Sequence, residues 1–260
     1  LMFKFCNLYS GSSGNCSLVE TENTKILVDA GVTSKKIREG LETIGKSINQ
    51  IDAVIITHEH SDHVKGLQVL CKNNNIPIYA NSHTFSMMKQ VIPEEQKKYF
   101  NTNEYFEIKD LRIYPFSIPH DAADPCGFSI YHDKNKISIA TDIGHMENKI
   151  IDNLAGSDYI LLESNYEPNM LKCSRYPYQL KKRILGENGH LSNEDAANTI
   201  STLVKLGVSN FSLGHLSEEN NLPELAYQTV MEEIMRNTYS DKLRLNVCDR
   251  YKPNDEIDIA

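Results

Sequence analysis

Apolar residues follow two patterns along the chain, and each pattern predicts a different kind of element. Short apolar runs bounded by turn residues predict strands, whereas apolar positions three or four residues apart predict helices. Strands are expected at 4–9, 25–28, 51–56, 76–80, 105–108, 111–118, 127–132, 136–141, 158–162, 211–213 and 243–248. Helices are expected at 33–45, 64–72, 84–91, 147–155, 177–185, 193–206 and 223–237.

These elements predict an α+β fold rather than one doubly wound sheet. Strands outnumber what a single sheet of that kind needs, and helical patterns occur towards both ends of the chain. We therefore expect an αββα sandwich, in which two mixed sheets pack together and helices flank them. Because no linker or compositional break divides the chain, residues 1–260 are expected to form a single domain.

Composition excludes several classes of protein. Lys and Arg total 27 against 35 Asp and Glu, so a formal charge of −8 argues against binding to nucleic acid by bulk charge. The longest apolar runs, such as 53–56, are far shorter than the ~20 residues of a membrane span. No secretory pattern opens the chain, and the six cysteines include no CxxC pair. We expect a cytoplasmic protein with reduced thiols and no membrane partner.

The most informative segment is a cluster of metal-ligand side chains at a strand-to-helix junction. His58, His60, Asp62 and His63 lie within six residues, directly after the apolar strand 51–56. Side chains two positions apart point the same way while the chain is extended, and the next two open a helix. One ion seldom takes four ligands from so short a span. The segment therefore predicts two adjacent metal ions rather than a solvated polar loop.

This HxHxDH pattern after an apolar strand resembles the metal motif of the metallo-β-lactamase superfamily. The resemblance implies three later ligands, each after a strand, and His120, Asp142 and His215 occur in that order. It implies one site formed by His58, His60, His120 and Asp142, and a second formed by Asp62, His63, Asp142 and His215. Asp62 is also expected to be catalytic, beside a hydroxide that bridges the ions. Zn, Mn and Fe all suit such ligands.

Two further residues resemble those of the phosphodiesterase branches. Glu163 ends the strand 158–162, where these branches carry a Glu. His190 opens a helix, where they carry a His that faces the scissile phosphate. The resemblance implies that both are catalytic, or that Glu163 orients His190 from a buried position. Asp121 is expected to hydrogen-bond a ligand histidine, and His83, His132 and His145 are expected in turns or on the surface.

Over residues 10–221 the chain resembles the bacterial YycJ (WalJ/VicX) group of this superfamily. The shared features are SGSSGN at 10–15, PHDA at 119–122, TDIG at 141–144, ESN at 163–165, and HLS at 215–217 followed by Asn220-Asn221. The resemblance implies a metal-dependent 5′-to-3′ exonuclease, and single-stranded DNA is the expected substrate.

Spacing argues against some neighbouring families. Only 22 positions separate His120 from Asp142, which leaves no room for the tRNA-clamping arm of tRNA 3′-processing endonucleases. The 73 positions from Asp142 to His215 do not hold the inserted domain of β-CASP nucleases, roughly 100–150 residues. A glyoxalase-II-type thioesterase, another small-molecule metallohydrolase and a metal-stabilised regulatory scaffold stay as alternatives. Oligomeric state stays open.

A basic segment from 168 to 186 favours the nuclease hypothesis. It contains no acidic residue and combines cations with tyrosines, which suits the phosphates and stacked bases of a single strand. A solvated basic helix face is the alternative. The candidate substrate-binding residues are Lys172, Arg175, Tyr176, Tyr178, Lys181, Lys182 and Arg183.

Overall fold

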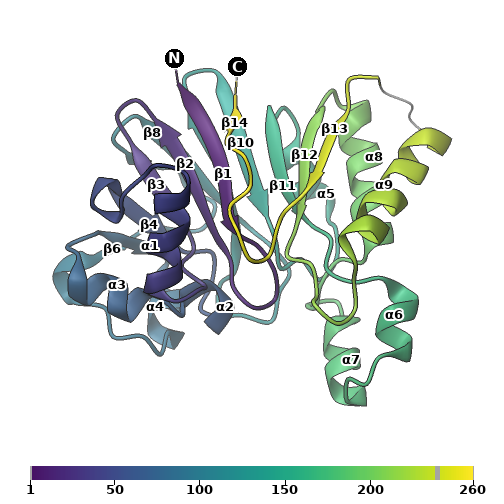
Figure 1. The fold of residues 1–260 in the computed structure, drawn as a ribbon, viewed down its shortest axis with the longest axis horizontal. Coiled ribbons are helices and arrows are strands. Elements are labelled where there is room, and N and C mark those ends of the chain that lie inside the picture. The colour runs from purple at the N-terminus through teal and green to yellow at the C-terminus, as the bar shows by residue number, and fades with distance from the viewer. Residues whose placement is uncertain (1, 238–240, 260) are drawn as a thin grey trace.

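The protein folds into four layers, with two sheets packed face to face and helices on both outer faces (Figure 1). The computed structural model describes residues 2–237 and 241–259. Each sheet has seven strands, in the orders β14-β1-β2-β3-β4-β5-β6 and β13-β12-β11-β10-β9-β8-β7. The prediction of two mixed sheets flanked by helices is confirmed.

The two sheets repeat one plan, an antiparallel part followed by a parallel part. In the first sheet β1 to β3 are antiparallel and β3 to β6 parallel. In the second, β7 to β10 are antiparallel and β10 to β13 parallel. The strands of the first sheet are β1 (Phe3–Tyr9), β2 (Cys16–Thr21), β3 (Lys25–Val28), β4 (Ala53–Ile55), β5 (Ile78–Ala80), β6 (Lys97–Tyr99) and β14 (Ile257–Asp258). Those of the second are β7 (Phe106–Ile108), β8 (Leu111–Ser117), β9 (Cys126–His132), β10 (Asn135–Ala140), β11 (Tyr159–Glu163), β12 (Asn210–Gly214) and β13 (Arg244–Val247).

Helices cover the outer face of each sheet, and one helical pair projects from the sandwich. The first sheet carries α1 (Ser34–Thr43), α2 (Ser61–Val64), α3 (Leu67–Asn73) and α4 (Ser82–Met87). The second carries α5 (Asn148–Leu154), α8 (Asn193–Lys205) and α9 (Pro223–Asn237). The pair α6 (Pro168–Cys173) and α7 (Tyr178–Ile184) extends below the second sheet in Figure 1. We call residues 168–184 the arm.

Buried apolar side chains form one cluster between the sheets and one beneath each helical layer. Phe5, Phe128 and Tyr159 belong to the central cluster, to which both sheets contribute. The arm has a small cluster of its own, formed by Tyr166, Leu171 and Ile184. The arm is therefore held mainly by local packing, whereas the strand ends are fixed by the whole sandwich. Among the described residues, no helix is long and apolar enough to cross a membrane.

Several elements differ from the expected ones. The sequence pattern did not predict β2, β6, β14 or α6. The expected helix 64–72 is two helices, because α2 begins at Ser61 and the chain turns at Gly66. The amide of Gly66 donates to the carbonyl of Ala30 (2.8 Å), and a Cβ at Gly66 would lie 2.4 Å from the carbonyl oxygen of Val32. The expected helix 84–91 begins at Ser82 and ends at Met87.

Candidate metal centre

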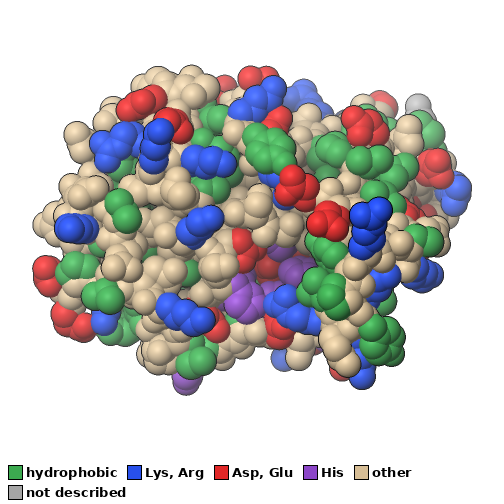
Figure 2. All heavy atoms as spheres, turned by 60° about the horizontal axis from the view of Figure 1, so that its bottom comes forward, with side chains coloured by type: hydrophobic (Ala, Val, Ile, Leu, Met, Phe, Trp, Pro, Cys, Tyr) green, Lys and Arg blue, Asp and Glu red, His purple; other side chains and the backbone are tan. Residues whose placement is uncertain are grey.

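Ligand-type side chains from both sheets meet at one end of the sandwich. They follow the carboxyl ends of β4, β8, β10 and β12, an edge of a sheet where functional groups commonly converge. Figure 2 shows histidine and acidic side chains in a hollow near the middle of this face, with basic side chains beside it. Six of the nine histidines of the chain belong to this site: His58, His60, His63, His120, His190 and His215.

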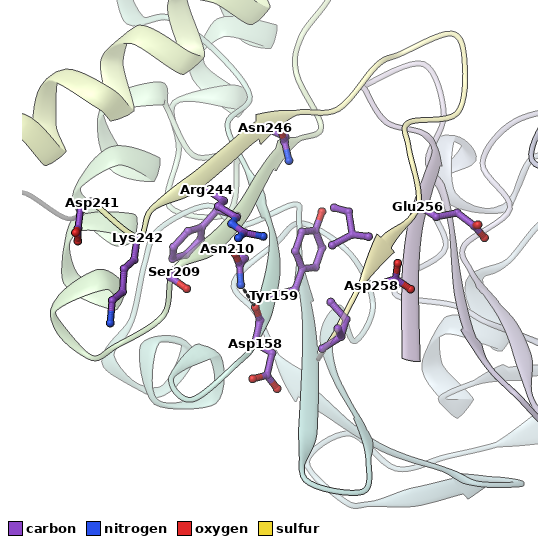
Figure 3. Close-up of a pocket in the computed structure, with 13 residues that line it drawn as sticks. Asp158, Tyr159, Ser209, Asn210, Asp241, Lys242, Arg244, Asn246, Glu256 and Asp258 are labelled. Carbon is purple, nitrogen blue, oxygen red and sulfur yellow. Dashed lines mark hydrogen bonds between the residues drawn. The ribbon is translucent and has the colours of Figure 1, made fainter. Parts of the chain in front are cut away.

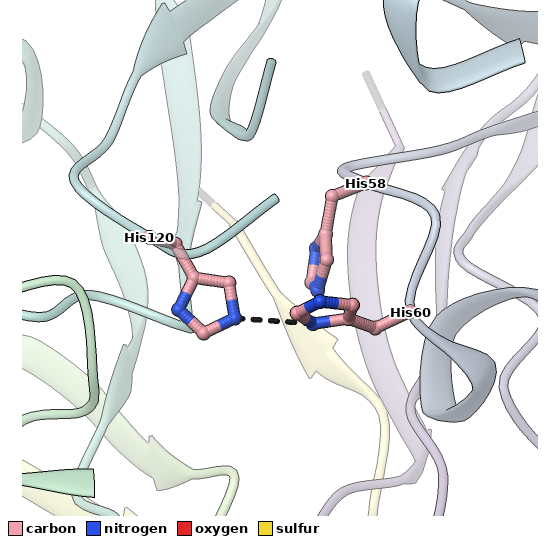
Figure 4. A group of neighbouring side chains, drawn as sticks. All are labelled: His58, His60 and His120. Carbon is pink, nitrogen blue, oxygen red and sulfur yellow. Dashed lines mark hydrogen bonds between the residues drawn. The ribbon is translucent and has the colours of Figure 1, made fainter. Parts of the chain in front are cut away.

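The first group consists of His58, His60 and His120 (Figure 4). One ring nitrogen from each lies within 4.8 Å of the others. His58 and His60 leave the same extended segment after β4, and His120 faces them from the end of β8, with its Nε2 3.2 Å from Nδ1 of His60. Three converging imidazoles can hold one divalent ion.

The second group consists of Asp62, His63, Asp142 and His215, whose ligand atoms also lie within 4.8 Å of one another. Nε2 of His215 is 3.3 Å from Asp62 and 3.5 Å from Asp142. Nε2 of His63 is 3.5 Å from Asp62 and 3.2 Å from Asp142. The two carboxylates therefore face the same pair of ring nitrogens.

Asp142 lies between the two groups. Its Oδ1 is 3.7 Å from Nε2 of His120 in the first group, and its Oδ2 is 3.2 Å from Nε2 of His63 in the second. This is the place that the sequence predicts for a ligand shared by two ions. Asp142 and His215 both have left-handed backbone conformations, with φ of 62° and 54°. Such angles are strained for residues other than glycine, and the surrounding contacts must hold them.

Three of the candidate ligand histidines donate a hydrogen bond from Nδ1, and this bond orients the ring so that Nε2 points into the ligand group. Nδ1 of His120 donates to the carbonyl of Gly189 (3.0 Å), and Nδ1 of His215 donates to Oε1 of Glu163 (2.7 Å). Nδ1 of His63 donates to Oδ2 of Asp29 (2.7 Å). Each of these rings therefore directs Nε2 towards the groups, and it can bind a metal ion through that nitrogen once Nε2 carries no proton.

Asp29 is a functional candidate that the sequence analysis missed. It follows β3, has a φ of 63° and is buried. Besides holding His63, its carboxylate accepts from the amide and the hydroxyl of Thr57 (2.9 and 3.0 Å). The Thr57 hydroxyl also lies 3.0 Å from Nδ1 of His58. Asp29 therefore orients rings of both groups, directly or through Thr57.

Glu163 and His190 form a network beside the second group. Glu163 is fully buried, and its Oε1 accepts from Nδ1 of His190 (2.8 Å) as well as from His215. Its Oε2 accepts from the amides of Ile143 and Leu191 (2.8 and 3.1 Å). Four N–H donors thus fill both oxygens, so Glu163 is built to orient imidazoles rather than to bind an ion. His190 keeps Nε2 free, and its ring is 12% exposed.

Electrostatics tie these groups together. Burial lowers the pKa of His58, and the charge of His63 lowers it further. Burial alone would lower the pKa of His215 too, but Asp142 and hydrogen bonds to Asp62 and Glu163 raise it to about 10. Burial raises the pKa of Asp142, yet His215 and His63 outweigh it and hold that pKa well below its ordinary value.

The donor set fits divalent ions. Nε2 of His58 and Oδ2 of Asp142 are buried and have no hydrogen-bond partner among the described residues. A buried polar atom without a partner costs about 1–3 kcal/mol, and a metal ion would satisfy both. Imidazole with carboxylate suits Zn, Mn and Fe.

The chain resembles a known family over most of its length. A family model described as "Beta-lactamase superfamily domain" matches residues 24–215. The chain belongs to this superfamily. It is 36% identical over 231 residues to "Exodeoxyribonuclease YycJ" of Bacillus anthracis, covering 88% of each chain. It is 36% identical over 237 residues to "Exodeoxyribonuclease WalJ" of Streptococcus pneumoniae serotype 2, covering 89% of this chain and 88% of that one.

A solved structure shows the same fold. The metallo-β-lactamase fold protein YhfI from Bacillus subtilis superposes with a TM-score of 0.70 at 14% identity, over 96% of this chain and 99% of that chain. The predicted superfamily and group are confirmed. The metallo-β-lactamase fold implies divalent metal ions, and the two ligand groups provide for them.

The loop at 10–15 borders the superfamily's metal motif. The amide of Asn15 donates to the carbonyl of Asp62 (2.8 Å), and the amide of Gly31 donates to the carbonyl of Asn15 (2.7 Å). A Cβ at Gly31 would lie 1.5 Å from the Asp62 carbonyl oxygen, so only glycine allows this approach. Nδ2 of Asn15 is 3.2 Å from Nε2 of His63.

The candidate substrate-binding residues all lie on the arm, but they differ in surroundings. Lys172, Arg175, Lys182 and Tyr178 are exposed. Lys181 donates to the carbonyl of Lys172 (2.7 Å) and so joins α7 to α6. Tyr176 packs against the arm's own cluster. Arg183 donates two hydrogen bonds to Asp121, whose Oδ1 also lies 3.5 Å from Nε2 of the candidate ligand His120.

The other histidines lie outside the centre. His83 and His145 are largely exposed, as expected. The expectation for His132 is wrong, because this residue ends β9, is buried, and has Nε2 3.4 Å from Asp110. Alternation along the strand 127–132 carries the signal that could have placed it.

A separate groove lies at the opposite end of the sandwich (Figure 3). It has a volume of about 870 Å³ and includes Asp158, Asn210, Arg244 and Asp258, from the amino ends of β11 and β12 and the edges of both sheets. Its charges are of both signs. The described residues place no cluster of metal-type ligands there, so the histidine centre is the candidate site.

Proposed function

We propose that this protein is a dinuclear-metal phosphodiesterase that acts as an exodeoxyribonuclease. The single observation that carries the proposal is His190, which is held by a buried carboxylate beside two complete ligand groups. A histidine that lies beside a two-metal centre and is not needed as a ligand can act as an acid or hydrogen-bond donor to a bound phosphodiester. The relatives named exodeoxyribonuclease, which match nearly the whole chain, supply the substrate class.

The chain's own residues have distinct roles in this proposal. Two ions would be held by His58, His60, Asp62, His63, His120, Asp142 and His215, and Asp142 is placed between the two ligand groups. When bound, the ions would supply an activated water and screen the charge of the phosphodiester. Besides serving as a ligand, Asp62 would accept a hydrogen bond from the attacking water and so orient it.

In its doubly protonated form, with Nδ1 donating to Glu163, His190 would stabilise the departing sugar oxygen through Nε2–H and give up that proton to it, which leaves a neutral imidazole. Glu163 acts as a positioning residue. Burial raises its pKa, but the charges and hydrogen bonds of His190 and His215 keep it well below the ordinary value, so it stays a carboxylate.

The finer parts of the proposal concern the strand, the direction and the location. We propose single-stranded DNA, digested 5′ to 3′, with the arm following its backbone. Exposed cations and Tyr178, which is 76% exposed, support this role because bases stack on aromatic rings and phosphates attract cations. We also propose a cytoplasmic location, which suits six cysteines that are all free in the described chain. Zn, Mn or Fe would serve as the ion.

The test is hydrolysis of single-stranded DNA that carries a different fluorophore at each end. The purified protein is stripped of metal, reloaded with Zn, Mn or Fe, and assayed beside a thioester substrate. We expect stepwise shortening of DNA that a chelator abolishes, and release of the 5′ label first. A duplex with blunt ends serves as the comparison for strand preference.

Each other outcome has a definite meaning. Cleavage of the thioester with intact DNA would overturn the proposal in favour of a glyoxalase-II-type thioesterase. Tight metal binding with neither activity would favour the regulatory scaffold. Early release of the 3′ label would reverse the proposed direction and leave the phosphodiesterase assignment standing.

A further inference from the structure

Arg183 and Asp121 form an ion pair that links the arm to the rim of the metal centre. Arg183 lies in the last turn of α7, and Asp121 directly follows His120. Nε of Arg183 donates to Oδ2 of Asp121 (2.5 Å), and Nη2 donates to Oδ1 (2.9 Å). Both oxygens of the carboxylate are therefore engaged by one guanidinium.

This pair reaches the atoms that would surround a metal ion. Oδ1 of Asp121 is 3.5 Å from Nε2 of His120, the ring nitrogen that faces the first ligand group. The hydrogen bonds of Asp121 raise the pKa of Arg183, and the carboxylates of Asp62 and Asp142 add to that increase. The guanidinium thus lies within the electric field of the carboxylates of the centre.

The pair is exposed enough to open. The side chains of Arg183 and Asp121 are 45% and 35% exposed, and ion pairs that solvent reaches to this extent stabilise a fold only weakly. A guanidinium presents the same two-pronged donor geometry to two phosphate oxygens as to a carboxylate. A phosphate group arriving at the centre is therefore a direct competitor for Arg183.

We propose that Arg183 binds a phosphate of the substrate strand and that Asp121 competes with that phosphate for the guanidinium. The proposal rests on the phosphodiesterase function given above. In the free protein the pair neutralises Asp121, whose charge would otherwise repel the strand at the rim. On binding, the guanidinium exchanges the carboxylate for the phosphate, so Asp121 limits affinity and selects strands that bring a phosphate to this position.

A plain structural role for the pair predicts something different. If the pair only fastens the arm, then weakening either partner disturbs the arm in the same way. If Asp121 competes with substrate, then the two partners have opposite effects on KM. The sign of the effect of Asp121→Asn therefore separates the two roles. Asparagine keeps one acceptor for Arg183 and removes only the charge.

The experiment measures kcat and KM for single-stranded DNA with metal-loaded protein. We expect Arg183→Gln to raise KM about tenfold, which corresponds to about 1.4 kcal/mol, with kcat within twofold. Asp121→Asn should lower KM about threefold. The KM of Arg183→Lys should lie between those of Arg183→Gln and the wild type, because lysine keeps the charge but loses the two-pronged donor geometry of the guanidinium. Loss of one phosphate contact should also reduce the slope of log KM against log salt by roughly 0.7.

A matched pair provides the control. Arg236 and Glu232 form an exposed ion pair on α9 (3.1 Å), so Arg236→Gln and Glu232→Gln should leave KM unchanged. Metal content is measured for every variant, since Asp121 adjoins a candidate ligand.

The possible failures are distinct. A wild-type protein that leaves DNA intact would overturn the proposed function, and this inference with it. An active wild type with an unchanged Arg183→Gln variant would overturn only the phosphate contact. A raised KM in both Arg183→Gln and Asp121→Asn would overturn the competition and assign the pair to fastening the arm.

Discussion

The metal centre and the arm differ in how firmly the chain holds their functional side chains. In the centre, His215 is fixed by Glu163 through its ring and by Ser10 through its backbone amide, and it lies on a strained turn at the end of a buried strand. On the arm, Lys172 and Lys182 are exposed, and a small separate cluster supports the helices.

This difference predicts a division of labour. Chemistry at phosphorus needs groups held to a fraction of an ångström, and the buried network provides this. Binding single-stranded DNA of any sequence needs positive charge for the phosphates and aromatic rings on which any base can stack. Changes in the centre should therefore act on metal content and kcat, and changes on the arm should act on KM and its salt dependence.

The largest effect is expected from Asp142→Ala. This change removes the carboxylate that faces both ligand groups and leaves His63 and His120 without their shared neighbour. We expect loss of metal and a fall in DNA hydrolysis of roughly 10³-fold or more, because several kcal/mol of charge stabilisation disappear. Metal analysis and rate measurements check this, with His83→Ala as the exposed control. Unchanged metal content would remove Asp142 from the centre.

His190→Ala should separate catalysis from metal binding. His190 clusters with Asp142, Glu163 and His215, but it belongs to neither the group of His58, His60 and His120 nor the group of Asp62, His63, Asp142 and His215. Since Glu163 is filled by four N–H donors, we expect metal content to stay at the wild-type level. We expect kcat to fall roughly 10²–10³-fold, the range for loss of an acid–base group, with little change in KM. His145→Ala, an exposed histidine that bonds the carbonyl of Glu187, is the control. A near-wild-type rate would contradict the assigned role.

Asp29→Asn tests how far the rigidity of the centre depends on orienting groups. An asparagine can still accept from Thr57, but its amide cannot accept the Nδ1 proton of His63, so the ring is no longer held with Nε2 bare. We expect metal affinity to fall roughly 10–100-fold and activity to return at high metal concentration. Asp52→Asn, which removes one partner of a surface ion pair with Lys109, is the control. Unaltered affinity would assign Asp29 to packing alone.

Density of metal-type side chains after an apolar strand pointed to His58, His60, Asp62 and His63, and the resemblance to the superfamily implied His120, Asp142 and His215. The fold brings these seven candidate ligands together. The sequence did not predict Asp29, since a single aspartate beside a strand is common in this chain, as Asp52 before β4 and Asp158 before β11 show, and only the fold brings Asp29 to His63. The sequence also did not show which side chains far apart along the chain would form ion pairs. Arg183 and Asp121 lie 62 positions apart, so only the fold shows that one predicted substrate contact is already bound.

Elements without a periodic pattern were the ones the sequence did not reveal. β6 reads Lys97-Lys98-Tyr99, and its place in the sheet comes from pairing with β5 rather than from alternation. The break at Gly66 follows from a close backbone approach, which composition does not encode. Local patterns therefore sufficed for layers and ligands, whereas tertiary contacts determine the short edges and the second partners.

Metal loading should depend steeply on pH. In the metal-free protein the pKa of His63 lies well above its ordinary value, since burial lowers it but Asp142 and Asp29 raise it more, and that of His215 is raised to about 10. Both rings are therefore protonated at neutral pH and must lose a proton to bind an ion. We expect release of roughly two protons on loading and an affinity that rises with pH between 6 and 8. Titration of stripped protein in a weak buffer with an indicator dye measures this, and a pH-independent affinity would contradict it.

The smallest effect is expected on the arm, and it completes the comparison. Replacing both Lys172 and Lys182 by alanine removes exposed charge without touching the pair formed by Arg183. We expect KM for single-stranded DNA to rise a few-fold at low salt, the slope of log KM against log salt to fall by roughly 1.4, and kcat to stay unchanged. The matched control replaces Lys134 and Lys205, two exposed lysines near the amino ends of β10 and β12, at the other end of the sandwich.

If this control raised KM as much as the arm variant, the overall charge of the protein rather than the arm would attract the DNA strand. If the arm variant instead lowered kcat and metal content, the arm would belong to the rigid centre, and the division between the two regions would be wrong.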